Sequence, residues 1–213
     1  DAGVQRAVEE SRAEFLSGQP FDRFHVTALV EDRAGRWRRG HVEGEVLAYP
    51  ASCVKLGFLV GAVHWCAAQG QAPDCLDAYT RPMIEVSDNV ATGFVVDAIT
   101  GAPDGPVEGA DVDAWIEQRR YTEHVLDAAG LLGPQRLFTK TYPTNSGEEP
   151  AQLEKLAWQR LGRNAMNADG AARLMLAIQS GAIEPQATAY MCSLLRRPTF
   201  SGYSALGGGL PPG

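Results

Sequence analysis

The most informative stretch of the sequence is residues 49–55, which read Tyr49-Pro50-Ala51-Ser52-Cys53-Val54-Lys55. Residues three apart share one face of a helix, so the Ser52 hydroxyl and the Lys55 amine can meet. From residue 54 to residue 65 the chain is apolar on nearly every side, which is typical of a helix buried all round. These patterns predict a central helix over residues 52–68 with a serine and a lysine at its first turn.

Lys55 stands out because lysine is rare in this chain. There are three lysines, Lys55, Lys140 and Lys155, against sixteen arginines. Arginine keeps its proton at accessible pH, whereas burial lowers the pKa of a lysine and allows it to lose one. A neutral Lys55 can act as general base on the Ser52 hydroxyl, and backbone N–H groups at the helix start can stabilise an oxyanion. The pair therefore indicates a nucleophilic serine.

A second motif, Ser87-Asp88-Asn89, precedes the next predicted helix. All three residue types are favoured N-caps, so the motif has a purely structural explanation. It also has a functional one, because the Ser87 hydroxyl can relay a proton between Lys55 and a leaving group while the Asn89 amide hydrogen-bonds Lys55 or the substrate. Its occurrence downstream of the serine–lysine pair favours the functional explanation.

The remaining patterns predict a helix, a β-hairpin and a long helical stretch. The first helix is expected over residues 4–16, and the two strands of the hairpin begin at residues 24 and 36. A two-stranded hairpin is marginal in water, so we expect the sheet to need further strands. The later helices are expected over residues 89–99, 112–130, 153–161, 169–180 and 185–195, with a Gly/Pro-rich loop at residues 101–111.

Composition bounds the class of protein. The chain has 213 residues, of which 45% are apolar and 21% charged, as in a globular protein of one large or two small domains. Its formal net charge of -7 makes nucleic acid and anionic membrane surfaces unfavourable partners. No apolar run reaches the roughly 18 residues of a spanning helix, so no membrane span is expected. Because the chain starts at Asp1, we expect a preceding leader or other segment to have been removed, and a secreted or periplasmic location.

Together the motifs resemble the serine β-lactamases of class A and the related penicillin-recognising enzymes. The order of the first helix, the hairpin, the serine–lysine helix and the Ser87-Asp88-Asn89 helix is similar, and so is the later run at residues 167–174. The resemblance implies the β-lactamase/transpeptidase-like fold class, an α/β domain joined to an all-α domain with the site between them. Residues 1–50 would form the N-terminal part of the α/β domain, residues 51–206 the all-helical domain, and residues 207–213 the loop leading to the family's third strand.

The same resemblance implies roles for the motif residues. Ser52 would be the acylated nucleophile, Lys55 its base, Ser87 the proton shuttle and Asn89 a positioning group. The reaction implied is hydrolysis of a small amide, ester or β-lactam through an acyl-enzyme, with no cofactor and no metal. A biosynthetic transacylase or a D-Ala-D-Ala-type peptidase on the same fold is an alternative. A non-catalytic binding protein that keeps the scaffold is an alternative of another class.

Three departures from the family pattern argue against a standard penicillinase. The Lys-Thr-Gly or Lys-Ser-Gly motif of the third strand is absent up to Gly213, so the sheet lacks its C-terminal strands and we expect further residues of the same protein to complete it. The omega-loop pattern Glu-x-x-x-Asn has no clean match; Glu149 is the nearest candidate for a deacylating base, but Leu153 stands where the Asn would fall. The spacing of 35 positions from Ser52 to Ser87 is short, and the loop at residues 101–111 looks inserted.

The cysteines and histidines suggest no competing chemistry. The four cysteines lack metal-binding spacing, and free buried thiols are favoured over a disulfide between Cys66 and Cys75. Adjacent residues on a helix point about 100° apart, so we expect Cys53 to pack rather than attack. His64 falls on the predicted buried helix and is expected to be a core histidine rather than a metal ligand.

Overall fold

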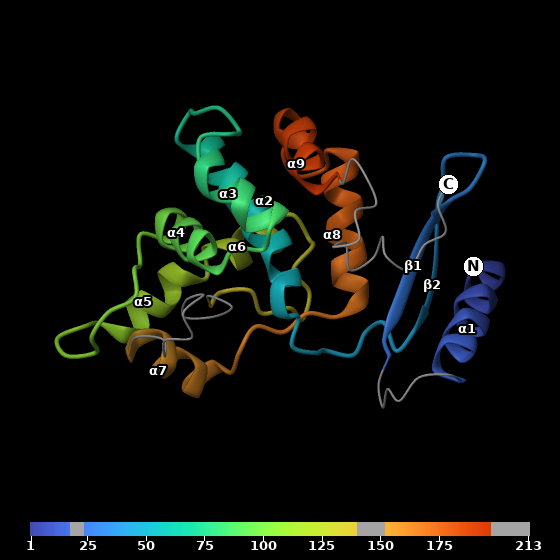
Figure 1. Cartoon of the computed structure of the whole chain (residues 1–213), viewed down its shortest axis with the longest axis horizontal. Coiled ribbons are helices and arrows are strands. Elements are labelled where there is room, and N and C mark those ends of the chain that lie inside the picture. The colour runs from blue at the N-terminus through green and yellow to red at the C-terminus, as the bar shows by residue number, and fades with distance from the viewer. Residues whose placement is uncertain (18–23, 140–151, 197–213) are drawn as a thin grey trace.

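The computed structural model describes residues 1–17, 24–139 and 152–196. Within these ranges the chain forms a small sheet beside a larger group of helices (Figure 1). The N-terminal elements are α1 (Ala2–Ser17), β1 (Val26–Glu31) and β2 (Trp37–Val42), and a 3-10 turn, η1 (Ala51–Val54), leads into α2 (Lys55–Ala68). The later elements are α3 (Asp77–Glu85), α4 (Asn89–Thr100), α5 (Val112–Arg119), α6 (Tyr121–Ala128), α7 (Gln152–Leu161), α8 (Ala168–Ser180), η2 (Pro185–Ala187) and α9 (Thr188–Leu195).

β1 and β2 form an antiparallel hairpin, as the sequence predicts, with Val26 opposite Val42. The hairpin lies between α1 on one side and α8 on the other (Figure 1). α1 approaches β2 closely at Gly40, where a Cβ atom would lie 2.7 Å from the backbone of Val4. In the part of the chain that the structure describes, the sheet has these two strands.

The hairpin is fastened to the helical body through the start of α8. The Asp169 carboxylate accepts hydrogen bonds from the Thr27 hydroxyl and from the Arg39 guanidinium of the hairpin. The hydrogen bonds to Asp169 hold the pKa of its carboxyl below the usual value, against the opposing effect of burial. An isolated β-bridge between Ala48 and Met166 continues the connection. These contacts fix the segment between β2 and η1, which leads into α2.

α2 is the central helix of the body and is buried over most of its surface. Its apolar residues form one core cluster with α3, α4, α6, α8 and α9, built around Phe58, Leu59, Val60 and Val63. Residues 51–68 are long and apolar enough to cross a membrane by length and composition alone, which corrects the expectation that no such run exists. Since 56% of that stretch is buried inside the protein, its apolar character is already used in packing.

Three details of the helical pattern differ from the prediction. The first turn of the predicted helix at residues 52–68 is the 3-10 turn η1. The single helix expected over residues 112–130 is two helices, α5 and α6, which meet at Arg120. α3 was not predicted because Pro82 interrupts its sequence pattern, yet the proline is accommodated inside the helix. The other predicted helices agree with α1, α4, α7, α8 and α9 to within a few residues.

The segments at residues 136–139 and 164–165 lie side by side, and we call this contact the neck. At the neck, Arg136 and Ala165 form an isolated antiparallel bridge. The buried Asn164 side chain accepts hydrogen bonds from the backbone N–H groups of Phe138 and Thr139, and donates one to the Thr139 carbonyl at 2.7 Å. Each of these buried backbone groups is thereby satisfied, so residues 138 and 139 are held to residue 164.

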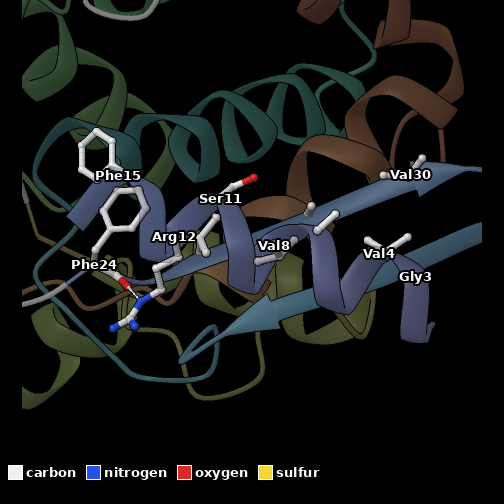
Figure 2. A pocket seen from close by; sticks show the side chains of 11 residues that line it. Gly3, Val4, Val8, Ser11, Arg12, Phe15, Phe24 and Val30 are labelled. Carbon is white, nitrogen blue, oxygen red and sulfur yellow. Dashed lines mark hydrogen bonds between the residues drawn. The ribbon is translucent and has the colours of Figure 1, made fainter. Parts of the chain in front are cut away.

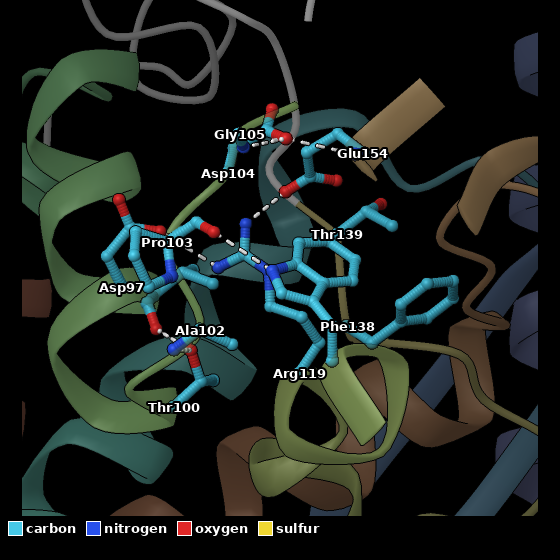
Figure 3. Close-up of polar contacts among 12 residues, drawn as sticks. Asp97, Thr100, Ala102, Pro103, Asp104, Gly105, Arg119, Phe138, Thr139 and Glu154 are labelled. Atoms are coloured by element: carbon cyan, nitrogen blue, oxygen red, sulfur yellow. Dashed lines mark hydrogen bonds and ion pairs between the residues drawn. The ribbon is translucent and has the colours of Figure 1, made fainter. Parts of the chain in front are cut away.

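α7 packs against the loop at residues 101–111 and against α5. A second apolar cluster joins them and includes Trp115, Phe138, Leu153 and Ala157. At its centre the fully buried Arg119 side chain binds the carboxylates of Glu154 and Asp97 (Figure 3). The loop and α7 therefore form one packed unit, although more than 40 residues separate them in the sequence.

A groove of about 620 Å³ lies between α1 and β1 (Figure 2). Its lining is largely apolar, and at one end the rings of Phe15 and Phe24 stack at 4.7 Å. Arg12 is the charged residue in this lining, and its Nε atom donates to the Phe24 carbonyl. The groove belongs to the hairpin side of the molecule and includes none of Ser52, Lys55 or Ser87.

Candidate active site

The serine–lysine pair lies where η1 meets α2, and the turn between α3 and α4 lies beside it. Two non-glycine residues of these segments have left-handed backbone conformations, Ala51 with φ of 45° and Ser87 with φ of 58°. Such conformations cost free energy and persist only where the surrounding structure enforces them. Ala51 directly precedes Ser52, so the backbone is constrained on both sides of the candidate site.

Four predicted site residues are brought together by hydrogen bonds. The Lys55 amine donates to the Ser87 carbonyl at 2.6 Å, to the Ser87 hydroxyl at 2.9 Å and to the Asn89 side-chain oxygen at 2.9 Å. The Ser87 hydroxyl in turn donates to the Ser52 hydroxyl at 2.9 Å. Ser87 thus bridges Lys55 and Ser52, which gives a continuous path for a proton between the amine and the nucleophile candidate.

The structural explanation of the Ser87-Asp88-Asn89 motif applies to its middle residue. Asp88 is the N-cap of α4, and its carboxylate accepts a hydrogen bond from the Ala91 N–H at 2.8 Å. Ser87 and Asn89 instead bind Lys55. The three residues of the motif therefore have different roles: Asp88 caps α4, while Ser87 and Asn89 bind Lys55.

The environment of Lys55 favours its neutral form. Only 2% of the residue is exposed, and all three hydrogen bonds that its amine donates end on uncharged oxygens. Burial lowers the pKa of Lys55 to about 8, although the nearby Asp88 carboxylate opposes this shift. A lysine with this pKa can accept a proton near neutral pH, which is the property that a general base requires.

The segment just before the nucleophile candidate is held by a cation–π contact. The Arg163 guanidinium lies 4.3 Å from the ring centre of Tyr49 and 4.8 Å from that of Trp158 on α7. Arg163 also donates to the Tyr49 hydroxyl at 3.1 Å. The return of the chain from α7 is thus in contact with the sequence that leads into Ser52.

Other sequence expectations are corrected or fall outside the structure. Glu149 lies outside the described residues. Cys53 is an exposed free thiol rather than a packed side chain, because the 3-10 turn directs position 53 to the surface. His64 is not a core histidine: its side chain is 41% exposed and its Nδ1 atom lies 2.6 Å from a carboxylate oxygen of Glu184.

Sequence reasoning also favoured free thiols at Cys66 and Cys75, and that preference was wrong. The two residues form a disulfide that joins the end of α2 to the turn before α3, with Cα atoms 6.1 Å apart. The sequence also gave no prediction of the buried ion pairs of Arg119, because Asp97 and Glu154 are distant from Arg119 in the sequence. The one signal available was a glutamate, Glu154, on the apolar face of a predicted helix.

Among the described residues, one group of side chains has the spacing of a metal site. His41, Glu45 and Asp169 have potential ligand atoms within 4.8 Å of one another. The Arg39 guanidinium binds both carboxylates, Glu45 at 3.2 Å and Asp169 in a closer contact. A positive charge is therefore already present between these carboxylates, and the group is explained by the attachment of the hairpin to α8.

Residues 65–213 match the beta-lactamase enzyme family. The chain belongs to this family. The match includes Ser87-Asp88-Asn89 and begins after Ser52 and Lys55, which are connected to the motif by the hydrogen bonds described above. Family membership confirms the predicted relationship to the penicillin-recognising enzymes and supports a serine hydrolase-like function in general terms.

Two individual proteins are similar to this chain. Golvesin of Dictyostelium discoideum is 31% identical over 219 residues, a match that covers 100% of this chain and 38% of Golvesin. The chain therefore spans less than half of that relative. The crystal structure of a β-lactamase from Sphaerobacter thermophilus aligns with a TM-score of 0.56 and 18% identity, over 100% of this chain and 74% of the β-lactamase. This likeness confirms the predicted fold class, and at that identity it shows the fold alone.

Proposed function

We propose that this protein is a serine hydrolase that acts through an acyl-enzyme on Ser52, with an amide, ester or β-lactam as substrate. The observation that carries the proposal is the hydrogen-bonded path from the Lys55 amine through the Ser87 hydroxyl to the Ser52 hydroxyl. The lowered pKa of Lys55 supports it, because a nucleophilic serine needs a base that is partly neutral near pH 7. Membership of the β-lactamase family supports the same class of reaction.

In the proposed acylation, the Ser52 oxygen forms a bond to the carbonyl carbon of the substrate. Its proton passes to the neutral Lys55 amine through the Ser87 hydroxyl, whose hydrogen can rotate between the two neighbours. The tetrahedral intermediate collapses as the bond from carbon to the leaving nitrogen or oxygen breaks. The Ser87 hydroxyl gives its proton to the leaving atom and regains one from Lys55, so the base returns to its neutral form.

The acyl-enzyme is completed by transfer to water or to another nucleophile. Attack of water on the ester carbonyl breaks the bond to Ser52 and releases an acid; attack of an amine gives the transacylase product instead. Glu149 remains the proposed base for water. The rate of deacylation of a penicillin adduct separates the two outcomes, since a chain without an effective base for water holds its adduct longer.

Covalent labelling tests the proposal. We expect one adduct on the chain, at Ser52, with the full mass of a fluorescent penicillin or the mass of a fluorophosphonate probe less HF, and no adduct on the Ser52→Ala variant. Ser193, an exposed serine on α9, provides the matched control, so Ser193→Ala should label like the parent protein. A parent protein that neither probe labels, or a Ser52→Ala variant that still labels, contradicts the mechanism.

We also propose that the protein works in an oxidising compartment, as a secreted or periplasmic protein. The disulfide between Cys66 and Cys75 supports this location, because structural disulfides persist where thiols are not kept reduced. Alkylation followed by mass measurement provides the test. We expect two alkylated thiols, Cys53 and Cys192, before reduction and four after it; four before reduction in protein taken from its native source contradicts the proposal.

A further inference from the structure

The residue before Ser52 has a backbone conformation that alanine disfavours. Ala51 has φ of 45°, in the left-handed region where the Cβ atom of any residue but glycine crowds the backbone. Without support, Ala51 turns to a negative φ, and the direction of Ser52, the next residue, changes with it. The contacts that hold this turn therefore decide where the Ser52 hydroxyl lies.

After Ala51 the chain is fixed by burial at the start of α2. Val54 is fully buried, and the Lys55 amine donates three hydrogen bonds across the site. These contacts hold the C-terminal side of the turn. A strained dihedral angle relaxes as soon as one side of the turn is free to move, so the N-terminal side has to be fixed as well.

Before Ala51 the chain is held by a backbone bridge and by an aromatic contact. Ala48 and Met166 exchange two backbone hydrogen bonds of 3.0 Å. Next along the chain, the Arg163 guanidinium lies 4.3 Å from the centre of the Tyr49 ring, and the Tyr49 hydroxyl accepts a hydrogen bond from Arg163 at 3.1 Å. Of the two contacts, the one with Arg163 lies closer to Ala51 along the chain.

Tyr49 depends on Arg163 because packing holds it only in part. Tyr49 is 41% exposed, and it belongs to neither of the two apolar clusters of the described residues. A cation over an aromatic ring, with a hydrogen bond from the same group, stabilises one orientation of such a side chain. Arg163 thus fixes the ring, and with it the backbone two residues before Ala51.

Arg163 is itself held by the body of the protein. Its guanidinium also lies 4.8 Å from the ring centre of Trp158 on α7. The next residue, Asn164, is buried and makes three hydrogen bonds across the neck. Arg163 therefore connects α7 and the neck with the turn that presents Ser52.

We propose that Arg163 is a positioning residue for acylation. By holding Tyr49 it keeps Ala51 in its left-handed conformation, which keeps the Ser52 hydroxyl 2.9 Å from the Ser87 hydroxyl. Arg163 acts through Tyr49 and not on the substrate. The inference rests on the proposed function, because the geometry that Arg163 maintains is the one in which Ser52 loses its proton.

Labelling of Ser52 by a fluorophosphonate, measured as a second-order rate constant, tests this role. Arg163→Met removes the cation, and we expect it to slow labelling about tenfold, the factor by which alanine disfavours a left-handed conformation. Tyr49→Leu should slow labelling to the same extent, and the double variant no further, because both substitutions remove one contact. Arg160→Met, which removes an exposed arginine of α7 three residues away, is the matched control and should label at the parental rate.

Ala51→Gly separates positioning from a general structural effect. Glycine adopts a left-handed conformation without a Cβ clash, so the turn then needs no support. In the Ala51→Gly background we expect Arg163→Met to slow labelling less than about twofold. A residue that only stabilises the fold slows labelling by the same factor in both backgrounds. Circular dichroism and urea titration check that all variants are folded under the labelling conditions.

The pH profile of labelling gives a second readout. In Arg163→Met, Lys55 keeps its burial and its hydrogen bonds to Ser87 and Asn89, so the midpoint should stay near pH 8 while the plateau rate falls. A plateau that is kept while the midpoint shifts shows that Arg163 acts on the charge of the base, and it overturns the positioning role.

The outcomes separate this inference from the proposed function. If the parent protein is never labelled at Ser52, the proposed function is wrong and this inference falls with it. If Ser52 is labelled and Arg163→Met or Tyr49→Leu labels like the parent, the positioning role is overturned while the nucleophile stands. An equal tenfold loss with Ala51 and with Ala51→Gly also overturns it, and so does a loss in the double variant that equals the product of the single losses.

Discussion

Two cations are buried in the part of the chain that the structure describes, Lys55 and Arg119, and their surroundings are opposite. Lys55 donates its hydrogen bonds to uncharged oxygens of Ser87 and Asn89, and burial lowers its pKa to about 8. Arg119 is held between the carboxylates of Glu154 and Asp97 and over the ring of Trp115 (Figure 3). Burial without a contacting countercharge makes a cation ready to lose its proton, whereas burial with paired carboxylates makes it a structural anchor.

The use of lysine at position 55 and arginine at position 119 agrees with the difference between their surroundings. Arginine has a planar guanidinium that keeps its charge and can bind two carboxylates at once. Arg119 on α5 can therefore connect Asp97 on α4 with Glu154 on α7. Lysine has a compact amine that can be deprotonated, which suits the contact with Ser87. In a chain with sixteen arginines and three lysines, a buried lysine with neutral partners is therefore informative.

The largest effect on the rate of Ser52 labelling should come from replacing Lys55 with arginine. Lys55→Arg keeps the positive charge but removes a group that can be neutral, so we expect labelling of Ser52 to slow by about 10³-fold. The second-order rate constant of labelling by a serine-directed probe measures this loss. Lys155→Arg, on the exposed side of α7, is the control and should label at the parental rate. A Lys55→Arg variant that keeps a tenth or more of the rate contradicts the role of Lys55 as base.

Removing the other buried cation should affect stability. Arg119→Met leaves Glu154 buried without its cation, and we expect the free energy of unfolding to fall by about 3–5 kcal/mol in urea titrations. Replacing both partners, Arg119→Met with Glu154→Leu, should destabilise less than Arg119→Met alone, because no charge then stays unpaired. Arg160→Met, which breaks an exposed ion pair with Asp113, should change stability by about 0–1 kcal/mol. If Arg119→Met and Arg160→Met lower the free energy of unfolding equally, Arg119 is not a structural anchor.

The pH dependence of acylation tests the titration of Lys55. The neutral amine is the reactive form, so the rate should rise with pH and level off above a midpoint of about 8. Between pH 8 and pH 6 the neutral fraction falls about fiftyfold, and the labelling rate should fall by the same factor. Stopped-flow or manual labelling over this range measures the profile. A rate that is constant from pH 6 to pH 8 excludes Lys55 as the titrating base.

The smallest effect on the labelling rate should come from Asp88, a carboxylate that acts on Lys55 through its charge. Asp88 raises the pKa of Lys55, so Asp88→Asn should move the midpoint of the pH profile to lower pH. At pH 7 the labelling rate should rise about twofold, since more of the amine is neutral. Asparagine is also a favoured N-cap, so α4 should be retained. A midpoint that moves to higher pH shows that the variant acts through the helix start rather than through charge.

The candidate site could be predicted where its geometry is local or belongs to a family pattern. Ser52 and Lys55 are three residues apart, so spacing alone places them on one helix face. The contact of Lys55 with Ser87 spans 32 residues, and it was expected because the order of the motifs resembles a known family. The hairpin and the apolar central helix were predicted from their periodicity and burial pattern.

The features that could not be predicted depend on how distant segments pack. Arg119 and Glu154 are 35 positions apart, and nothing local distinguishes a buried arginine from an exposed one. The exposure of Cys53 follows from the 3-10 geometry of η1, whereas a regular α-helix was assumed. His64 lies on a helix that is buried over most of its surface, yet it is half-exposed and pairs with Glu184. Sequence periodicity gives the average burial of a helix and misses such exceptions.

The neck at Arg136 and Ala165 has a consequence for how related chains can diverge. Because the neck is joined by backbone and Asn164 hydrogen bonds, and Glu154 on α7 binds Arg119, a change in the number of residues between Thr139 and α7 does not pull on the body. Doubling the length of such a connection costs only about 0.6 kcal/mol of closure entropy. Insertions and deletions should therefore accumulate among relatives between the position of Thr139 and the start of α7.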